Sequence, residues 1–132
     1  MHIKKILITS SFYPPHHFGG DAVHAKQLAE ALAKEGHKVQ VFTSMDAYNL
    51  KRKEKRSIQN DNGVIVHRIK SPLGIFEPIL NYTFGTQNYT YNYFKNLIKK
   101  EKFDVVHHHN ISLLGYKILK KIGKYKNFYT SV

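Results

Sequence analysis

Short apolar runs alternate with helix-like stretches along nearly the whole chain, and this alternation constrains the fold more than any other feature. Apolar runs of this length, with few charges inside them, suit strands buried in a parallel sheet. Consecutive parallel strands need a crossover connection, which is normally a helix. The expected strands cover residues 3–9, 39–43, 64–69, 104–107 and 127–130. The pattern therefore predicts the α/β class, with a mostly parallel sheet and helices on both faces.

Three helices are expected between these strands. The first should have Asp21 as its N-cap and should end near Gly36, a residue type that favours a left-handed helix end. The second is expected over 88–100 and the third over 111–122. In the first helix, apolar residues recur at the spacing of one helical face: Ala25, Leu28, Ala29 and Leu32.

Two connections look irregular. Pro72, Gly74 and Pro78 are expected to break the chain after the third strand, and residues 45–62 form a long polar connection that ends in a turn. The polar connection contains a cluster of cations, Lys51, Arg52, Lys53, Lys55 and Arg56. Three interpretations of this cluster stay open: a solvated surface, an RNA-binding patch, or a contact with anionic lipid.

Length and charge narrow the class of protein. The 132 residues suit one domain, residues 1–132, and the fifth strand begins so near the end that we expect a sheet truncated there. Lys and Arg outnumber Asp and Glu by 21 to 9, a net charge of +12 that implies an anionic partner. The chain has no cysteine, and its first apolar run is too short for a signal peptide, which favours a cytoplasmic location.

The loop after the first strand, "SSFYPPHHFGGDAVH", is the first candidate site. Gly19 and Gly20 stand just before a helix, whose free N–H groups and positive dipole end can hold an anion. Glycines let the backbone approach such a ligand closely. The spacing matches neither the dinucleotide fingerprint G-x-G-x-x-G nor a P-loop. A plain tight turn before a helix remains an equal alternative.

The second candidate is the run of histidines that follows the fourth strand. On a strand, His107 and His109 share one face and His108 points to the other. Two histidines fall short of the three or four ligands of a metal site, and nothing in the sequence fixes His16, His17 or Asp21 beside them, so no metal is predicted. No other cofactor is predicted either. We expect one of His107 and His109 to line a cleft and the other to be buried. No nucleophile elbow and no carboxylate pair at catalytic spacing is visible, so no catalytic residue is assigned.

These segments together resemble the amino-terminal half of glycosyltransferase family 4, the retaining enzymes of the GT-B type. "ILITSSFYPPHHFGGDAVHAKQLAEALAKEGHKVQVFTS" is similar to the family's first strand, Gly-Gly loop, first helix and second strand. "FDVVHHHNISLLG" is similar to its Asp-Val-Val-His-x-His strand, and "NFYTSV" to a strand that ends Thr-x-His in many members. The resemblance covers nearly the whole chain.

The resemblance implies a Rossmann-like domain that binds the acceptor, facing a carboxyl-terminal domain that binds a nucleotide-sugar. It places Gly19, Gly20 and Asp21 near the donor's diphosphate or sugar. It places the acceptor cleft at Tyr13, His107, His109 and Asn110. The histidine nearest the transferred sugar would follow Val132, and the donor domain is absent, so the chain alone should not catalyse transfer.

The implied partners are a nucleotide-sugar, bound through the missing domain, and a lipid-linked or glycan acceptor. An anionic membrane on the cytoplasmic side is compatible with the basic cluster, and nucleic acid is not favoured. Two other functions stay open from the residues: a stand-alone or split-gene module that binds a phosphorylated ligand, and a basic adaptor for membranes or nucleic acid.

Overall fold

The computed structural model describes residues 2–14, 20–48 and 58–129. Within them lies a six-stranded sheet with the order β3-β4-β2-β1-β5-β6. Strand β3 pairs antiparallel with β4 at one edge, and the other pairs are parallel. The predicted mostly parallel, Rossmann-like sheet is confirmed. The strands are β1 (Lys5–Thr9), β2 (Lys38–Ser44), β3 (Ile58–Asp61), β4 (Val64–Ile69), β5 (Val105–His108) and β6 (Lys126–Tyr129).

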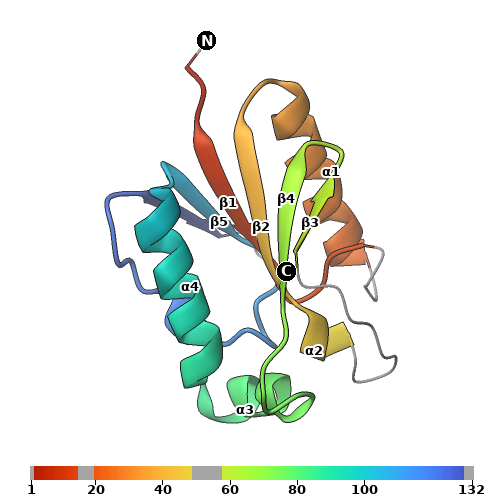
Figure 1. Cartoon of the computed structure of the whole chain (residues 1–132), viewed down its shortest axis with the longest axis vertical. Helices are drawn as coiled ribbons and strands as arrows, with labels where there is room; N and C mark the ends of the chain where they lie inside the picture. Colours follow the sequence, from red (N-terminus) through yellow and green to blue (C-terminus); the bar gives the residue numbers. More distant parts are fainter. Residues whose placement is uncertain (1, 15–19, 49–57, 130–132) are drawn as a thin grey trace.

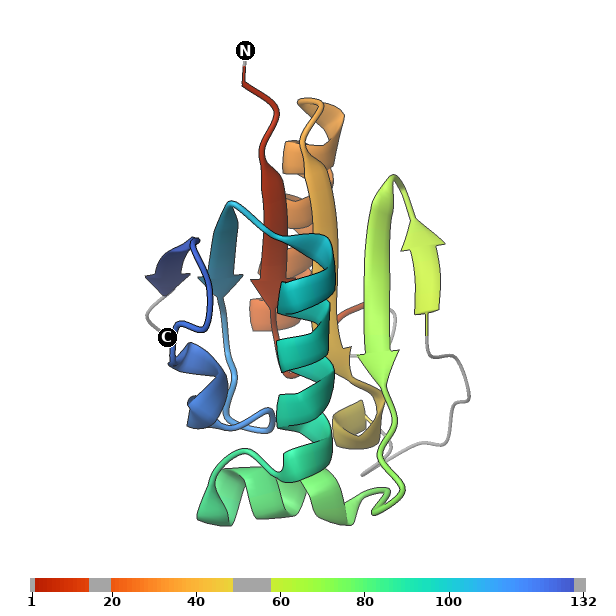
Figure 2. The same ribbon diagram turned by 60° about the vertical axis from the view of Figure 1, so that its left-hand side comes forward.

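Two long helices cover opposite faces of the sheet (Figures 1 and 2). Helix α1 (Gly20–Lys34) packs Ala25 and Ala29 into one buried cluster with Ile8 of β1. Helix α4 (Asn88–Glu101) packs Phe94 into a second cluster with Leu7 of the same strand. Neighbouring residues of β1 thus feed different cores, as the alternation of side chains along a strand requires. The prediction of helices on both faces is confirmed.

Two short helices lie beyond the carboxyl ends of the strands. Helix α2 (Met45–Tyr48) follows β2 directly, and α3 (Phe76–Phe84) lies across the end of the molecule, crosswise to α4 (Figure 2). The expectation that Pro78 breaks the chain is wrong. Pro78 is the third residue of α3, within the first turn, where a missing N–H removes no helical hydrogen bond.

The predicted helix over 111–122 is also wrong. Only a 3-10 turn, η1 (Tyr116–Leu119), forms there. Gly115 stands before it with a φ of +90°, and a Cβ on Gly115 would lie 2.6 Å from the backbone nitrogen of Thr86. The segment forms a compact loop instead, which still buries Ile111 and Ile118.

Two smaller corrections concern the connections. Helix α1 begins at Gly20, so Asp21 is the second helical residue and not the N-cap. Strand β3 lies inside the stretch expected to be a polar connection, and a turn at Asn62 and Gly63, both with positive φ, joins it to β4. An edge strand this short and polar carries little of the apolar pattern that reveals a buried strand.

Candidate functional site

The loops after β1 and β5 meet at the carboxyl edge of the sheet. Thr9 and His108 are paired in the register of the two strands. Beyond them, the backbone N–H of Ser11 donates to the carbonyl of Asn110 at 2.6 Å, and that of His109 donates to the carbonyl of Thr9 at 2.8 Å. The structure therefore brings together the two segments that the sequence singled out, although about a hundred positions separate them.

A cluster of three histidines forms on the α1 face of this edge. The rings of His107 and His109 stack with centroids 4.4 Å apart, and the ring of His24, from α1, lies 5.8 Å from that of His109. His109 is buried and His107 is half-buried, so the expectation of one buried member holds. Burial, reinforced by the nearby His24, lowers the pKa of His107 below its usual 6.5. His107 therefore favours the neutral form, which can both donate and accept hydrogen bonds.

His108 points to the opposite face, as its position on the strand predicts. Its Nδ1 lies 2.6 Å from Oγ1 of Thr9, and its ring contacts Phe94 of α4 at a centroid distance of 6.4 Å. Burial lowers the pKa of His108 to about 4. His108 is therefore neutral at pH 7, and its contacts tie β5 to β1 beneath the site.

Tyr13, in the loop after β1, is buried in the core beneath α1. Its side chain is 0% exposed and belongs to the core under α1, so it does not lie on an open cleft surface. Arg68, at the carboxyl end of β4 and 1% exposed, donates to the carbonyls of Tyr13 at 2.9 Å and of Pro14 at 2.8 Å. The sequence reasoning missed Arg68. The signal was an arginine on the same face of the strand as Val64 and Val66, where the pattern predicts an apolar residue.

Of the remaining predicted site residues, the structure describes some and not others. The side-chain Oδ1 of Asn110 accepts hydrogen bonds from the N–H of Ser112 at 3.1 Å and from its hydroxyl at 2.9 Å, so Asn110 shapes its own loop. Gly20 and Asp21 form the first turn of α1, at the carboxyl edge of the sheet (Figure 1). Gly19 and the cations Lys51, Arg52, Lys53, Lys55 and Arg56 lie outside the described residues.

A buried carboxylate network ties α3 to the strand ends. The N–H of Ser71 donates to Oδ2 of Asp46 at 2.6 Å, and its hydroxyl donates to Oε1 of Glu77 at 3.1 Å. Oε2 of Glu77 accepts from the N–H of Thr90 at 3.0 Å and from its hydroxyl at 2.6 Å. Burial, together with the neighbouring Glu77, raises the pKa of Asp46 from 3.8 to about 6, against the opposing Ser71 hydrogen bond.

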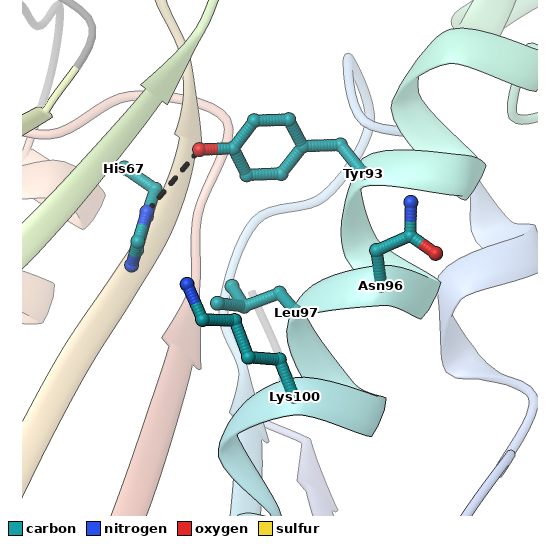
Figure 3. Close-up of a pocket in the computed structure, with 5 residues that line it drawn as sticks. All are labelled: His67, Tyr93, Asn96, Leu97 and Lys100. Carbon is teal, nitrogen blue, oxygen red and sulfur yellow. Dashed lines mark hydrogen bonds between the residues drawn. The ribbon is translucent and has the colours of Figure 1, made fainter.

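A cavity of about 290 Å³ lies on the α4 face, between β4 and α4 (Figure 3). His67 stands in its wall, with Nε2 2.7 Å from Oε1 of Gln40 and Nδ1 3.2 Å from the hydroxyl of Tyr93. Burial lowers the pKa of His67. Both ring nitrogens are occupied by the protein, which makes His67 a part of the wall and separates this cavity from the histidine cluster on the α1 face. The lining residues are His67, Tyr93, Asn96, Leu97 and Lys100.

Among the described residues, no three His, Cys, Asp or Glu side chains lie in an arrangement that could hold a metal ion. In the same part of the chain, no helix combines the length and apolar character needed to cross a bilayer.

The sheet order, the helices on both faces and the loops at the carboxyl edge define a Rossmann-like α/β domain. The family model of Glycosyltransferase Family 4 matches residues 18–130. The chain therefore belongs to Glycosyltransferase Family 4.

The chain is also similar to individual proteins and to a solved structure. An uncharacterized glycosyltransferase of Methanocaldococcus jannaschii is 42% identical over 66 residues, covering 50% of this chain and 15% of the relative. An uncharacterized protein of the cps region of Klebsiella pneumoniae is 28% identical over 131 residues, covering 92% of this chain and 34% of the relative. The chain thus spans about a third or less of the length of these relatives.

The chain superimposes with a TM-score of 0.63 and 13% identity on a solved structure, the catalytic domain of starch synthase IV from Arabidopsis thaliana bound to ADP and acarbose. The match covers 85% of this chain and 29% of that one. At this identity the likeness concerns the fold, which is that of a GT-B glycosyltransferase domain.

Proposed function

We propose that this chain is the acceptor-binding domain of a retaining glycosyltransferase that uses a nucleotide-sugar donor. In this proposal the donor binds mainly to a second domain in the longer protein. In this proposal residues 1–132 do not catalyse transfer by themselves, because the donor contacts belong to that second domain. The acceptor would be a lipid-linked sugar or another glycan.

The observation that carries the proposal is the start of helix α1 at the carboxyl edge of the sheet. Helix α1 begins at Gly20, eleven positions after β1 ends at Thr9. Ligands of open α/β sheets bind at this edge, and the unpaired N–H groups of a helix start favour anions. As the bond from sugar to diphosphate breaks, negative charge grows on the leaving phosphate, and donors fixed in advance stabilise it.

The β5 loop supplies the other side of the proposed site. His107 is half-buried beside His24 and His109 and could exchange hydrogen bonds with sugar hydroxyls in its neutral form. Arg68 holds the carbonyls of Tyr13 and Pro14, and so fixes the point from which the loop leads to Gly19 and Gly20. No metal or cofactor is part of the proposal.

The first experiment compares two valine substitutions in the full-length protein. Gly20→Val puts a branched side chain at the proposed phosphate position, while Gln27→Val places the same side chain on an exposed position of α1. We expect Gly20→Val to abolish release of nucleoside diphosphate from the donor, with circular dichroism unchanged, and Gln27→Val to stay active. Normal activity of a folded Gly20→Val protein would contradict the assignment.

The second experiment separates this proposal from a stand-alone module that binds a phosphorylated ligand. Calorimetry of the isolated chain with a panel of nucleotide-sugars should show weak binding or none, since the donor domain carries most of the donor contacts. Micromolar binding would contradict that division between the domains and favour the module.

The basic cluster at residues 51–56 belongs to the proposal as a contact with an anionic, cytoplasmic membrane surface. Replacing Lys51, Arg52, Lys53, Lys55 and Arg56 with glutamine should weaken binding to acidic vesicles. Binding that survives all five replacements would rule out this role of the cluster.

A further inference from the structure

Two buried polar side chains interrupt the apolar sheet face beside the cavity between β4 and α4. Gln40 of β2 and His67 of β4 point to the α4 face, where Phe42 and Ile69 of the same strands enter the apolar core. Gln40 is 6% exposed and His67 is 9% exposed. Buried polar groups are costly unless they are hydrogen-bonded, so we followed the hydrogen bonds of this pair.

A chain of hydrogen bonds fixes the positions of the protons around His67. The carboxylate of Glu101, which pairs with Lys5 at 2.8 Å, also accepts a hydrogen bond from the side chain of Gln40. Because a carboxylate only accepts, Gln40 donates through its amide nitrogen, and its Oε1 faces Nε2 of His67 at 2.7 Å. Nε2 therefore carries a proton. Burial lowers the pKa of His67, so the ring is neutral and Nδ1 accepts from the hydroxyl of Tyr93 at 3.2 Å.

This order of donors and acceptors determines which hydrogen bonds Tyr93 can make in the cavity. Its hydroxyl proton is held by Nδ1 of His67, so the oxygen can accept a hydrogen bond from a ligand but has no second proton to donate. A hydroxyl group of a ligand is such a donor. The ring of Tyr93 and the side chain of Leu97 supply apolar walls beside it (Figure 3).

The cavity also contains one positive charge. The side chain of Lys100 extends toward His67, with its ammonium group inside the ring of lining residues (Figure 3). None of the five lining residues is acidic, and within residues 2–14, 20–48 and 58–129 no ion pair includes Lys100. The neighbouring carboxylate of Glu101 pairs with Lys5 instead. The charge of the cavity therefore favours an anion.

The volume limits the size of the ligand. At about 290 Å³, the cavity lies at the lower end of the range of about 300–1,000 Å³ that is typical of ligand pockets. It is too small to enclose a nucleotide-sugar and suits a molecule of the size of one phosphorylated monosaccharide. Its walls are side chains of β4 and α4 that face one another, so it is a gap between packed elements and not an open surface patch.

We propose that this cavity binds a small hydroxylated anion of the class of monosaccharide phosphates. The phosphate binds the ammonium group of Lys100, and a sugar hydroxyl donates to the oxygen of Tyr93. The sugar ring packs between Tyr93 and Leu97, and the amide of Asn96 can donate or accept beside it. The site is on the α4 face, apart from the start of α1 where the donor phosphate is proposed to bind, and it does not depend on the proposed transfer activity.

Calorimetry of the full-length protein with glucose 6-phosphate, in the absence of a sugar donor, tests the site. Glucose and inorganic phosphate serve as probes of the two halves of the ligand. We expect saturable binding of glucose 6-phosphate, at least about tenfold tighter than that of either half, because only the whole molecule reaches both Lys100 and Tyr93.

Two neighbouring lysines of α4 provide a matched pair of variants. Lys100→Gln should weaken the binding of glucose 6-phosphate at least about tenfold, since a hydrogen bond between charged groups is lost. Lys99→Gln removes the same charge from an exposed position that lines a different cavity, and it should bind like wild type. Tyr93→Phe should weaken the binding of glucose 6-phosphate about three- to tenfold and leave that of inorganic phosphate unchanged.

Hydrogen exchange locates the contact directly. Glucose 6-phosphate should slow the exchange of backbone amides in residues 93–101 and leave those in the first turn of α1 unchanged. Gly20→Val, which alters the proposed donor site, should bind glucose 6-phosphate as wild type does.

Three results would overturn the proposal: no saturable binding of glucose 6-phosphate, wild-type affinity in Lys100→Gln, or slower exchange at the start of α1 in place of α4. These measurements contain no donor, whereas the proposed activity is followed by release of nucleoside diphosphate. Failure of this site is therefore distinct from failure of the proposed function.

Discussion

Asp46 should make the stability of this protein fall as the pH rises from about 4 to about 7. Its carboxyl is 1% exposed, and burial raises its pKa from 3.8 to about 6 in the folded state. Because the folded pKa is the higher one, the folded state binds the proton more tightly than the unfolded state. The stabilising contribution of the neutral carboxyl is therefore complete below pH 3.8 and is lost as the pH rises through about 6.

The size of this effect follows from the shift. A rise of about two units in the pKa of Asp46 corresponds to about 3 kcal/mol, at 1.36 kcal/mol for each unit. Asp46→Asn removes the titration and keeps an oxygen that can accept from the N–H of Ser71. The free energy of unfolding of Asp46→Asn, relative to wild type, should therefore increase by about 2.4 kcal/mol between pH 4 and pH 7, because part of the change falls below pH 4.

The assay is urea denaturation at a series of pH values from 4 to 7.5. Other buried groups, such as His108, titrate in both proteins, so their contributions to the pH dependence of stability cancel in the difference between the two. Glu35→Gln, at an exposed position after α1, controls for the loss of one negative charge. A difference between Asp46→Asn and wild type that is flat within the error of the extrapolation would refute the reasoning, and a fall with rising pH would mean that the fold stabilises the carboxylate.

Other substitutions test the supports of the site through the same urea midpoints. Gly115→Ala should cost about 3 kcal/mol, because its positive φ and its approach to Thr86 both exclude a Cβ; a loss below 1 kcal/mol would contradict that geometry. Arg68→Lys should cost about 1–3 kcal/mol, since an ammonium group replaces the planar fork that reaches two carbonyls; wild-type stability would show that the charge alone suffices. Glu77→Ala should cost about 2–4 kcal/mol by leaving the N–H of Thr90 without its acceptor, with partial recovery in Glu77→Gln; equal stability of the two variants would exclude the hydrogen-bond explanation.

The sequence was sufficient for the parallel core because each buried strand must present apolar side chains to both faces. Residues such as Leu7 and Ile8 enter different clusters, and a run of that kind is recognisable without any knowledge of its neighbours. The first helix was recognisable for a similar reason, since its apolar residues repeat at helical spacing. The opposite orientations of His107 and His108 follow from strand alternation alone.

The loops were decided by tertiary contacts. Ile111 and Ile118 have helical spacing, yet the approach of Gly115 to Thr86, far away in the sequence, selects a turn in place of a helix. Proline 78 suggested a break, but its place in the first turn of α3 made it harmless. Local patterns did not reveal these outcomes: Thr86 is distant from Gly115 in the sequence, and the start of α3 at Phe76 carries no capping side chain that would mark it.

The residues of the candidate site also divide into those that the sequence revealed and those that only the tertiary structure revealed. The sequence alone pointed to the Gly19–Gly20 loop and the histidine run, since glycines before a helix and histidines after a strand are local signals. Two other contacts could be seen only in the tertiary structure. Ser71 links Asp46 to Glu77, and Arg68 donates to the backbone of the loop at Tyr13. The local sequence specifies each strand. Parallel strands place their carboxyl ends at one edge of the sheet, whatever the connections between them. Which polar side chains meet at that edge is decided only by the order of the strands in the assembled sheet.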